Sequence, residues 1–386
     1  MDSPPADRSK CAPSRIAIFI PSLEGGGAER VTVTLCNALA ARGHAIDLVL
    51  AKAKGPFLAD LSPNVRMVDL GHDRVARSLP GLVRYLRAER PDALMSVLSH
   101  ASVIARFAVG LARTPVRHVV AEHTTYGVQT DAQLGLRGRG MVALMRRLYP
   151  HAQHIITVSD GAANALATYI GVDRQLITTV YNPFDIEAIA RSMSQAISHP
   201  WFQDGNRGVI VAIGRLSPEK DFATLLNAFA QVRSARPARL LILGEGAERE
   251  ALEGQAAALA LSSEDFQMPG FVQNPFAYLS RSDVFVLSSR YEGLPSAVVE
   301  ALACEVPIVA TDCPSGPSEI LEGGRWGRLV PMGDAAALAD AIVEALDENG
   351  PRRGRERASQ FDTQKAVDGY LKVLLPHERP ESDALS

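Results

Sequence analysis

The chain has 386 residues, of which 47% are hydrophobic and 22% charged, and its formal net charge is -3. This length allows two domains of ordinary size, and the composition is typical of a soluble globular protein. The charge is uneven, with 21 Lys and Arg against 16 Asp and Glu in residues 1–190 but 19 against 27 in residues 191–386. A basic first half favours anionic lipid head groups or a phosphorylated acceptor, and scattered surface arginines explain it equally well.

Cysteine use and hydropathy exclude several classes of protein. Cys11, Cys36, Cys304 and Cys313 form no Cys-x-x-Cys pair and no ligand spacing with histidine, so we expect reduced thiols, a cytoplasmic protein and no metal site. The chain also lacks Asp-x-Asp, the usual carboxylate cradle for a metal-bridged diphosphate. No apolar run approaches the roughly 18 residues of a membrane span. We therefore expect a protein that is soluble or lies on a membrane without crossing it.

The first half alternates short β-branched runs with longer helical ones. The run Ile16 to Ile20 is apolar throughout, and a Gly-rich turn and a helix over about 28–42 follow it. Further strands are expected near 45–51, 65–70, 92–97, 116–121, 153–158 and 176–180. Strands separated by helices predict a parallel, doubly wound sheet, and continuous apolar strands agree because helices cover both faces of such sheets.

This alternation breaks near Tyr181-Asn182-Pro183-Phe184 and begins again at about residue 208. Strands are then expected near 208–213, 239–243, 283–287 and 307–310, with helices near 221–233, 247–260, 295–304 and 334–347. A final helix over 363–375 is expected to cross back onto the first domain. We predict a loose tail over 1–14, a Rossmann-like domain over 15–190, a linker over 191–207, a second such domain over 208–360, a crossover helix over 361–376 and a loose tail over 377–386.

Two cations lie five residues apart in the segment that follows the strand 208–213. These are Arg215 and Lys220. Arg offers a planar fork of donors and Lys a point charge, so together they can neutralise a diphosphate without a metal. A solvated loop that contains Arg and Lys by chance is the alternative. The motif described next decides against it.

Two carboxylates lie eight residues apart after the strand 283–287. Glu292 precedes a helix that begins near Pro295, and Glu300 lies within that helix. The N–H groups at the start of the helix can hold phosphate or sugar oxygens, and each carboxylate can accept two hydroxyls of a ribose or pyranose. Glu300 as a surface residue is the alternative, but its neighbours in the helix are unusually apolar. The two motifs together predict a pocket for a nucleotide-sugar in the cleft between the domains.

Six motifs in this order resemble the retaining glycosyltransferases of the GT-B fold known as family 4, or group 1. They are Gly25-Gly26-Gly27-Ala28-Glu29-Arg30, Gly214-Arg215 with Lys220, Gly244-Glu245-Gly246, Gly270-Phe271-Val272, Glu292 with Glu300, and the run from Thr311 to Ile320. They span nearly the whole chain. The resemblance implies two Rossmann-like domains facing a central cleft, with the second domain holding the donor.

The resemblance also implies a role for each matching position. Arg215 and Lys220 would hold the donor diphosphate and Glu300 the ribose. The transferred sugar would be held by Glu292 with the segment Gly293, Leu294, Pro295 and Ser296. Phe271 and Val272 would contact the base, and Gly26 and Gly27, with Gly25, would approach the donor phosphate or the acceptor. The catalytic set would be His123, Glu292, Arg215 and Lys220, with no metal and no cofactor.

His123 follows the strand 116–121, so we expect it at the cleft. Similar enzymes place a histidine here beside the donor sugar, and a structural histidine at a strand end is the alternative. Enzymes of this kind are thought to use front-face return, in which the leaving phosphate deprotonates the acceptor. The residues do not decide between this route and a covalent intermediate.

Family habit favours a UDP-sugar donor and a glycan or lipid-linked acceptor in bacterial polysaccharide or glycan assembly. The basic, partly apolar segment 136–148 could lie at an anionic membrane surface, although an ordinary amphipathic helix explains it too. No nucleic-acid partner is expected. One rival function is a GT-B nucleotide-sugar epimerase or another nucleotide-sugar-binding protein. An oxidoreductase is disfavoured because Arg30 stands where Gly-x-Gly-x-x-Gly needs glycine and Asp47 falls inside the second strand.

Overall fold

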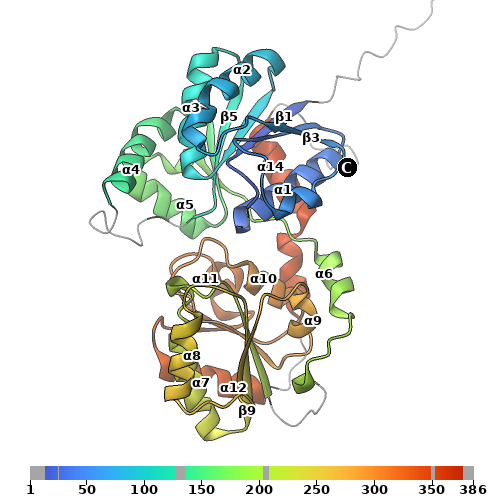
Figure 1. The fold of residues 1–386 in the computed structure, drawn as a ribbon, viewed down its shortest axis with the longest axis vertical. Helices are drawn as coiled ribbons and strands as arrows, with labels where there is room; N and C mark the ends of the chain where they lie inside the picture. The colour runs from blue at the N-terminus through green and yellow to red at the C-terminus, as the bar shows by residue number, and fades with distance from the viewer. Residues whose placement is uncertain are drawn as a thin grey trace, which may run out of the picture.

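The computed structural model describes residues 14–24, 26–124, 126, 135–202, 208–348 and 353–376. Gly25 and the two predicted tails, apart from Ser14, lie outside the described residues. The described chain forms two α/β lobes, which lie one above the other in Figure 1. Each lobe is built on its own parallel sheet.

The first lobe contains a seven-stranded sheet in the order β3-β2-β1-β4-β5-β6-β7, in which every neighbouring pair is parallel. Its strands are β1 (Arg15–Ile20), β2 (Ala45–Leu50), β3 (Val65–Asp69), β4 (Ala93–Val97), β5 (Arg117–Glu122), β6 (His154–Thr157) and β7 (Ile177–Thr179). Its helices are α1 (Gly27–Ala41), α2 (Leu79–Glu89), α3 (Ser99–Ala112), α4 (Leu136–Leu148) and α5 (Asp160–Leu166).

Both faces of this sheet are buried because side chains alternate along each strand. Ile16, Ile18 and Ile20 of β1 pack in the same core as α1, whereas Ala17 and Phe19 pack in a second core with α2 and α3. This explains why the strand is apolar from Ile16 to Ile20. A strand of a sheet covered on both faces has no polar side.

The second lobe contains a six-stranded sheet in the order β10-β9-β8-β11-β12-β13, again parallel throughout. Its strands are β8 (Gly208–Ile213), β9 (Ala238–Leu243), β10 (Phe266–Gly270), β11 (Val284–Leu287), β12 (Ile308–Thr311) and β13 (Arg328–Val330). Its helices are α6 (Ile186–Met193), α7 (Phe222–Ala235), α8 (Arg249–Ala258), α9 (Pro275–Leu279), α10 (Ser296–Ala303), α11 (Pro317–Ile320), α12 (Ala335–Asp347) and α13 (Gly354–Ala358).

The sequence pattern missed two strands of the second lobe, β10 and β13. Both lie at the edges of the sheet. They are short and only partly buried, and β10 ends in Pro269-Gly270. An edge strand lacks the continuous apolar run by which the central strands were recognised. The predicted fold class, two doubly wound Rossmann-like domains, is nevertheless confirmed.

The chain crosses between the lobes twice, and the two crossing segments lie side by side. Phe184 N donates to Phe361 O at 3.0 Å, and Thr363 N donates to Phe184 O at 3.0 Å. The first crossing therefore lies earlier than the boundary predicted at residue 190. The reason is that α6 packs against α9 and α10, with Ile186 and Ile189 in the core of the second lobe.

After the second crossing, α14 (Thr363–Leu374) lies against the first lobe. Val367 and Tyr370 are buried in the same core as α1. At the end of α1, Arg42 donates to Gln364 Oε1 at 2.7 Å and pairs with Asp368. The prediction that the final helix returns to the first domain is confirmed.

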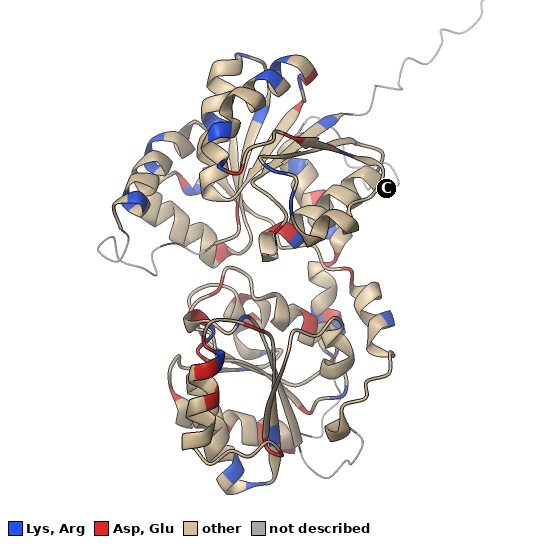
Figure 2. Cartoon of the chain, in the orientation of Figure 1, with Lys and Arg blue, Asp and Glu red and all other residues tan. Residues whose placement is uncertain are grey.

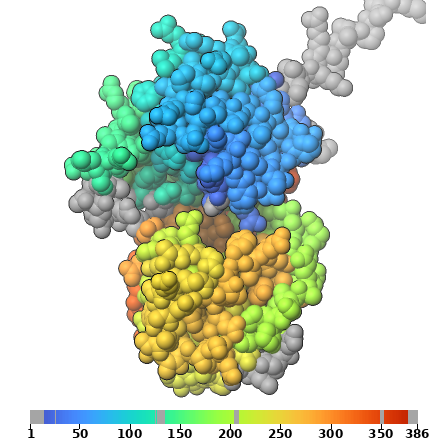
Figure 3. Space-filling view, in the orientation of Figure 1, coloured from blue at the N-terminus to red at the C-terminus, as the bar shows by residue number. Residues whose placement is uncertain are grey.

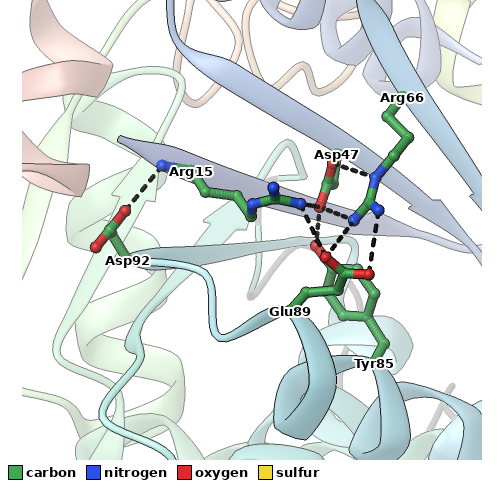
Figure 4. A network of polar contacts seen from close by, with 6 residues as sticks. All are labelled: Arg15, Asp47, Arg66, Tyr85, Glu89 and Asp92. Carbon is green, nitrogen blue, oxygen red and sulfur yellow. Dashed lines mark hydrogen bonds and ion pairs between the residues drawn. The ribbon is translucent and has the colours of Figure 1, made fainter. Parts of the chain in front are cut away.

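A buried ionic network explains why a charged residue stands inside β2. Asp47 is 2% exposed, accepts from Arg66 Nε at 2.8 Å and from the Tyr85 hydroxyl at 2.6 Å, and also pairs with Arg15 (Figure 4). Burial would raise the pKa of Asp47, but the hydrogen bonds from Arg66 and Tyr85 hold it below its usual value. Asp47 is thus saturated by protein groups, which gives it a structural role.

Candidate functional site

The predicted donor motifs lie where the strand order of the second sheet reverses. β8 and β11 are neighbours, but the chain leaves β8 towards β9 and β10, and leaves β11 towards β12 and β13. Loops at the carboxyl ends of two such strands diverge and leave a crevice, where open α/β sheets bind ligands. The loop after β8 carries Arg215 and Lys220, and the loop after β11 carries Glu292. Figure 3 shows a hollow between the two lobes on this face of the molecule.

The structure brings Lys220 and Glu292 into direct contact. Lys220 Nζ lies 2.6 Å from Glu292 Oε1, and the side chains are 20% and 12% exposed. The same carboxylate oxygen accepts from Ser289 Oγ at 2.6 Å. The two motifs found separately in the sequence therefore form one charged centre, part-buried at the crevice.

Further hydrogen bonds hold the two loops together. Asp221, at a left-handed φ of 48°, caps α7 and accepts from Arg290 Nε at 3.0 Å. Ser288 Oγ donates to Lys220 O at 2.7 Å. These bonds fix the backbone at Lys220 and at the residue after it, so together with the pairing to Glu292 they hold the ammonium group in place before any ligand arrives.

Arg215 differs from Lys220 in its surroundings. It is exposed and, among the described residues, its guanidinium has no hydrogen bond or ion pair. The turn that carries it is fixed by Gly214 N, which donates to Leu243 O, and by Leu216 N, which donates to Glu245 O. The glycines of Gly244-Glu245-Gly246 are needed here because a Cβ at either one would overlap the carbonyl of Gly214 or Leu216.

The remaining predicted donor-side positions lie on α10 and after β10 of the same lobe. Glu300 lies in the middle of α10, half-buried and without a hydrogen bond or ion pair among the described residues. Burial raises the pKa of Glu300, and the charge of Arg30 on α1, in the other lobe, opposes that rise. Phe271 is 82% exposed after β10, whereas Val272 packs against the core of the second lobe.

The first lobe contributes two glycines and a histidine. Gly26 and Gly27 begin α1, where a Cβ at Gly26 would meet the carboxylate of Glu29. His123 follows β5, and burial lowers its pKa to about 4, although a hydrogen bond with Asn182 acts in the opposite direction. His123 is thus a neutral imidazole at neutral pH.

The two lobes touch directly at the predicted sugar-binding loop. A Cβ at Gly293 would lie 2.5 Å from His123 O, which explains why this position needs glycine. Ser159 Oγ donates to Gly293 O at 2.8 Å. Within the second lobe, Ser315 Oγ donates to Glu292 O at 2.6 Å. The loop Glu292–Ser296 is therefore held from both lobes.

One interlobe contact was missed by sequence reasoning. Glu319 of α11 accepts from Asp160 N at 2.9 Å and from Gly161 N at 3.4 Å, at the start of α5 in the other lobe. A carboxylate is favourable at this position because the N–H groups at a helix start are unpaired and carry partial positive charge. The sequence identifies the run Thr311 to Ile320 only as a motif, because nothing in it indicates which helix Glu319 caps.

A buried carboxyl next to His123 was also missed. Glu122 is 1% exposed and accepts hydrogen bonds from Tyr126 at 2.6 Å and from Tyr149. Burial raises the pKa of Glu122 to about 7, and the bonds from Tyr126, Tyr149 and Ser99 act against that rise. The sequence does contain a signal for this buried carboxyl, because Glu122 is a charged residue at the end of an apolar run.

Comparisons with known proteins agree with this arrangement. Residues 25–188 match the family described as Glycosyltransferase Family 4, and residues 207–348 match Glycosyl transferases group 1. One match covers each lobe, in the order that the fold requires. The chain belongs to the family 4, or group 1, glycosyltransferases.

Relatives of this glycosyltransferase match along nearly their whole length. One is N-acetylgalactosamine-N,N'-diacetylbacillosaminyl-diphospho-undecaprenol 4-alpha-N-acetylgalactosaminyltransferase of Campylobacter jejuni, 27% identical over 94% of this chain and 99% of that protein. Another is the lipopolysaccharide core biosynthesis glycosyltransferase LpsE of Rhizobium meliloti, 28% identical over 90% and 96%. The fold matches Anabaena HepE in complex with UDP-glucose, with a TM-score of 0.77 and 22% identity over 93% and 99% of the two chains.

Two features are absent from the described part of this glycosyltransferase. Across residues 14–348 and 353–376, with the gaps given above, no three His, Cys, Asp or Glu side chains gather as a metal site requires. In the same part of the chain, none of the helices combines the length and the apolar character needed to span a membrane.

Proposed function

We propose that this glycosyltransferase moves a sugar from a UDP-sugar to a glycan or lipid-linked acceptor, with retention of configuration and without a metal ion. One observation carries the proposal: the Lys220–Glu292 centre at the crevice of the donor sheet, with His123 opposite it across the interlobe contact. The similarity to HepE solved with UDP-glucose and to enzymes named for bacterial surface glycans supports the choice of donor and acceptor.

The donor would lie along the crevice with its charged and polar parts matched to the residues there. Lys220 and Arg215 take the diphosphate, since Lys220 is held in place and Arg215 is exposed. Glu300 takes the ribose hydroxyls, which would supply the hydrogen bonds that its carboxylate lacks among the described residues. Phe271 and Val272 meet the base, and Gly26 and Gly27 approach from the other lobe.

The transferred sugar would bind Glu292 and the N–H groups of Gly293, Leu294 and Ser296. Glu292 Oε1 already accepts hydrogen bonds from Lys220 Nζ and Ser289 Oγ. A carboxylate held in this way is better suited to accepting sugar hydroxyls than to attacking the anomeric carbon. In front-face return the bond from that carbon to the diphosphate oxygen breaks, and the acceptor oxygen bonds on the same face. The acceptor proton passes to the leaving phosphate, and Lys220 and Arg215 stabilise the charge that develops there.

A peripheral position on an anionic membrane is part of the proposal. Figure 2 shows Lys and Arg at several points along α4, and Arg137, Arg139 and Arg147 are exposed there. Exposed apolar side chains accompany them, Leu136 on α4 (87% exposed) and Leu111 on the adjacent α3 (54%). Phosphatidylglycerol vesicles should retain the protein, and Arg137→Glu/Arg139→Glu should release it. Equal retention of both proteins would remove this part of the proposal.

The reaction is tested with purified enzyme, radiolabelled UDP-sugars and a polyprenyl-diphosphate glycan acceptor, with and without EDTA. The proposal predicts an acceptor-dependent product whose new linkage has the donor's anomeric configuration by NMR, formed equally well with EDTA. Inverted configuration would overturn retention, and loss of product with EDTA would overturn metal independence. A new nucleotide-sugar formed without acceptor would favour an epimerase.

A further inference from the structure

A cavity of about 410 Å³ lies between α14 and the face of the sheet that it covers, beside the two crossing segments. Arg117 at the start of β5 and His154 at the start of β6 form part of its wall, and Lys365 and Lys372 of α14 lie opposite. The other lining residues are Thr178, Thr179, Val180, Tyr181, Gln360, Phe361, Ala366, Gly369 and Val373. The cavity is separate from the donor crevice, because Arg117 and His123 lie at opposite ends of β5, roughly 20 Å apart at the usual rise per residue.

The cavity is lined by three basic side chains that have no carboxylate partner among the described residues. Arg117 Nε donates to Val373 O at 2.7 Å, and no other hydrogen bond or ion pair of this guanidinium is found among the described residues. Lys365 Nζ donates to the neutral Gln360 Oε1 at 2.9 Å, and Lys372 has no partner in the described part of the chain. Three cations thus surround one space without a carboxylate paired to any of them.

The nearby carboxylates are engaged elsewhere. None of the described residues that line the cavity is Asp or Glu. Asp160 accepts from the hydroxyl of Thr179 and pairs with Arg174. Asp362 caps α14, and Asp368 pairs with Arg42 on the α1 side of the helix. The positive charge around the cavity is therefore not neutralised by these groups.

We infer that this cavity binds a phosphorylated small molecule, about the size of pyrophosphate or a sugar phosphate. The free terminal nitrogens of Arg117 match two oxygens of one phosphate, and the two ammonium groups supply the point charges that a multiply charged anion needs. The hydroxyl of Thr178, bonded to His154 Nε2 at 2.7 Å, adds a polar group to the wall. Burial lowers the pKa of both Arg117 and His154, as expected for basic groups that lack an acidic partner.

Occupation of this site links α14 to the hinge between the lobes. An anion held by Arg117 and by Lys365 and Lys372 ties α14 to β5. Tyr181 and Phe361, which belong to the two crossing segments, line the same space. The site therefore lies directly beside the two segments that join the lobes.

Calorimetric titration of the full chain with inorganic pyrophosphate, and separately with inorganic phosphate, tests the inference. The donor crevice is first disabled by Arg215→Ala/Lys220→Ala, because it also attracts phosphate. In this background pyrophosphate should still bind, and adding Lys365→Ala/Lys372→Ala should weaken its binding at least tenfold. Lys365→Arg/Lys372→Arg should bind within about threefold of the background, because the charges remain.

Two results would overturn the inference. One is no pyrophosphate binding at millimolar concentration once the crevice is disabled. The other is binding that Lys365→Ala/Lys372→Ala leaves unchanged. Circular dichroism and the Arg variant distinguish a loss of binding from a loss of folding. A parallel arm with phosphatidylglycerol vesicles separates a lipid head group from a free phosphate, since vesicle binding should be unaffected by the lysine substitutions.

Discussion

The two sides of the donor crevice are built from opposite kinds of polar group. On the side of the second lobe, Lys220 and Glu292 are charged, paired and held by loop hydrogen bonds. On the side of the first lobe, His123 is neutral at neutral pH and Glu122 has a pKa of about 7. Burial is the main reason that the pKa of His123 is lowered and that of Glu122 is raised.

This difference indicates how the work is divided between the lobes. In the proposed reaction, negative charge develops on a leaving diphosphate, and the fixed cations of the second lobe would stabilise it. In the first lobe, burial favours the uncharged forms of His123 and Glu122, which would suit hydrogen bonds to a sugar or to an uncharged hydroxyl acceptor. Substitutions on each side test this difference and are given in order of decreasing expected effect.

The largest effect is expected from Lys220→Ala. Removing this cation leaves Glu292 without its ion-pair partner and the leaving group without a fixed charge, so kcat should fall by about 100- to 1,000-fold. Initial rates at saturating donor measure the effect. Arg236→Ala is the matched control, since Arg236 follows the end of α7 that is farthest from the crevice loop and pairs there with Asp347. If Lys220→Ala keeps more than a tenth of the rate, the charged side of the contrast is wrong.

Gly293→Ala tests the contact between the two sides. Its Cβ would lie 2.5 Å from His123 O, a backbone atom that cannot move away easily, so the lobes should be held apart. Misplacing the sugar-binding loop by about 1 Å should lower kcat/KM roughly 100-fold. Gly254→Ala in α8 is the control, because a Cβ there meets no atom within 4 Å. Equal rates for both variants would show that the lobes need not meet here.

Glu122→Gln tests whether Glu122 in the first lobe is protonated, through the pH dependence of stability. Between pH 4.5 and 7 the folded chain keeps a proton on Glu122 that the unfolded chain has lost, so this group's contribution to stability falls as the pH rises through 7. Gln does not titrate. The unfolding free energy of the variant relative to the native chain should therefore rise over this range, by about 3 kcal/mol, and then level off.

Urea unfolding at several pH values measures that difference. His118 and His123 have lowered pKa values, so they change stability in the opposite direction below pH 6.5, but they are present in both proteins and cancel. A difference independent of pH would mean that Glu122 is ionised in the folded chain.

Glu300→Gln should act on donor binding more than on turnover. Its carboxylate is expected to accept ribose hydroxyls, and weakening such a bond by about 1.4 kcal/mol raises KM for the donor tenfold. Steady-state kinetics with varied donor measure this, and Glu264→Gln, on the exposed surface, is the control. A fall in kcat without a change in KM would contradict the ribose assignment.

The smallest effect is expected from Glu319→Gln. The amide keeps an oxygen acceptor for Asp160 N but loses the charge that favours the start of α5, so the unfolding free energy should fall by only about 0.5–1 kcal/mol. The loss should shrink in 1 M NaCl, because salt screens the interaction. Loss of more than about 3 kcal/mol would show that Glu319 is a buried, essential partner instead.

The sequence predicted the fold and the charged side better than the neutral side, for a physical reason. Strand and helix periods are local, and Lys220 and Glu292 each stand in a loop at a recognisable strand end. Glu319 and Asp160 are 159 residues apart and meet only because the lobes close in one way. The crossing at Phe184 lies a few residues before the boundary predicted at 190, since the apolar face of α6 does not reveal which lobe covers it.

The proposed function depends on Lys220 and Arg215 binding the diphosphate of a nucleotide-sugar without a metal, with Glu292 beside them for the sugar. Thermal shift with UDP, GDP, ADP and their sugars, with and without EDTA, measures this binding. A ligand at 100 times its Kd adds about 2.7 kcal/mol of stability. We predict a clear shift with UDP and UDP-sugars that EDTA leaves unchanged and that is lost in Lys220→Ala. No shift with any nucleotide, or an equal shift in Lys220→Ala, would contradict the claim.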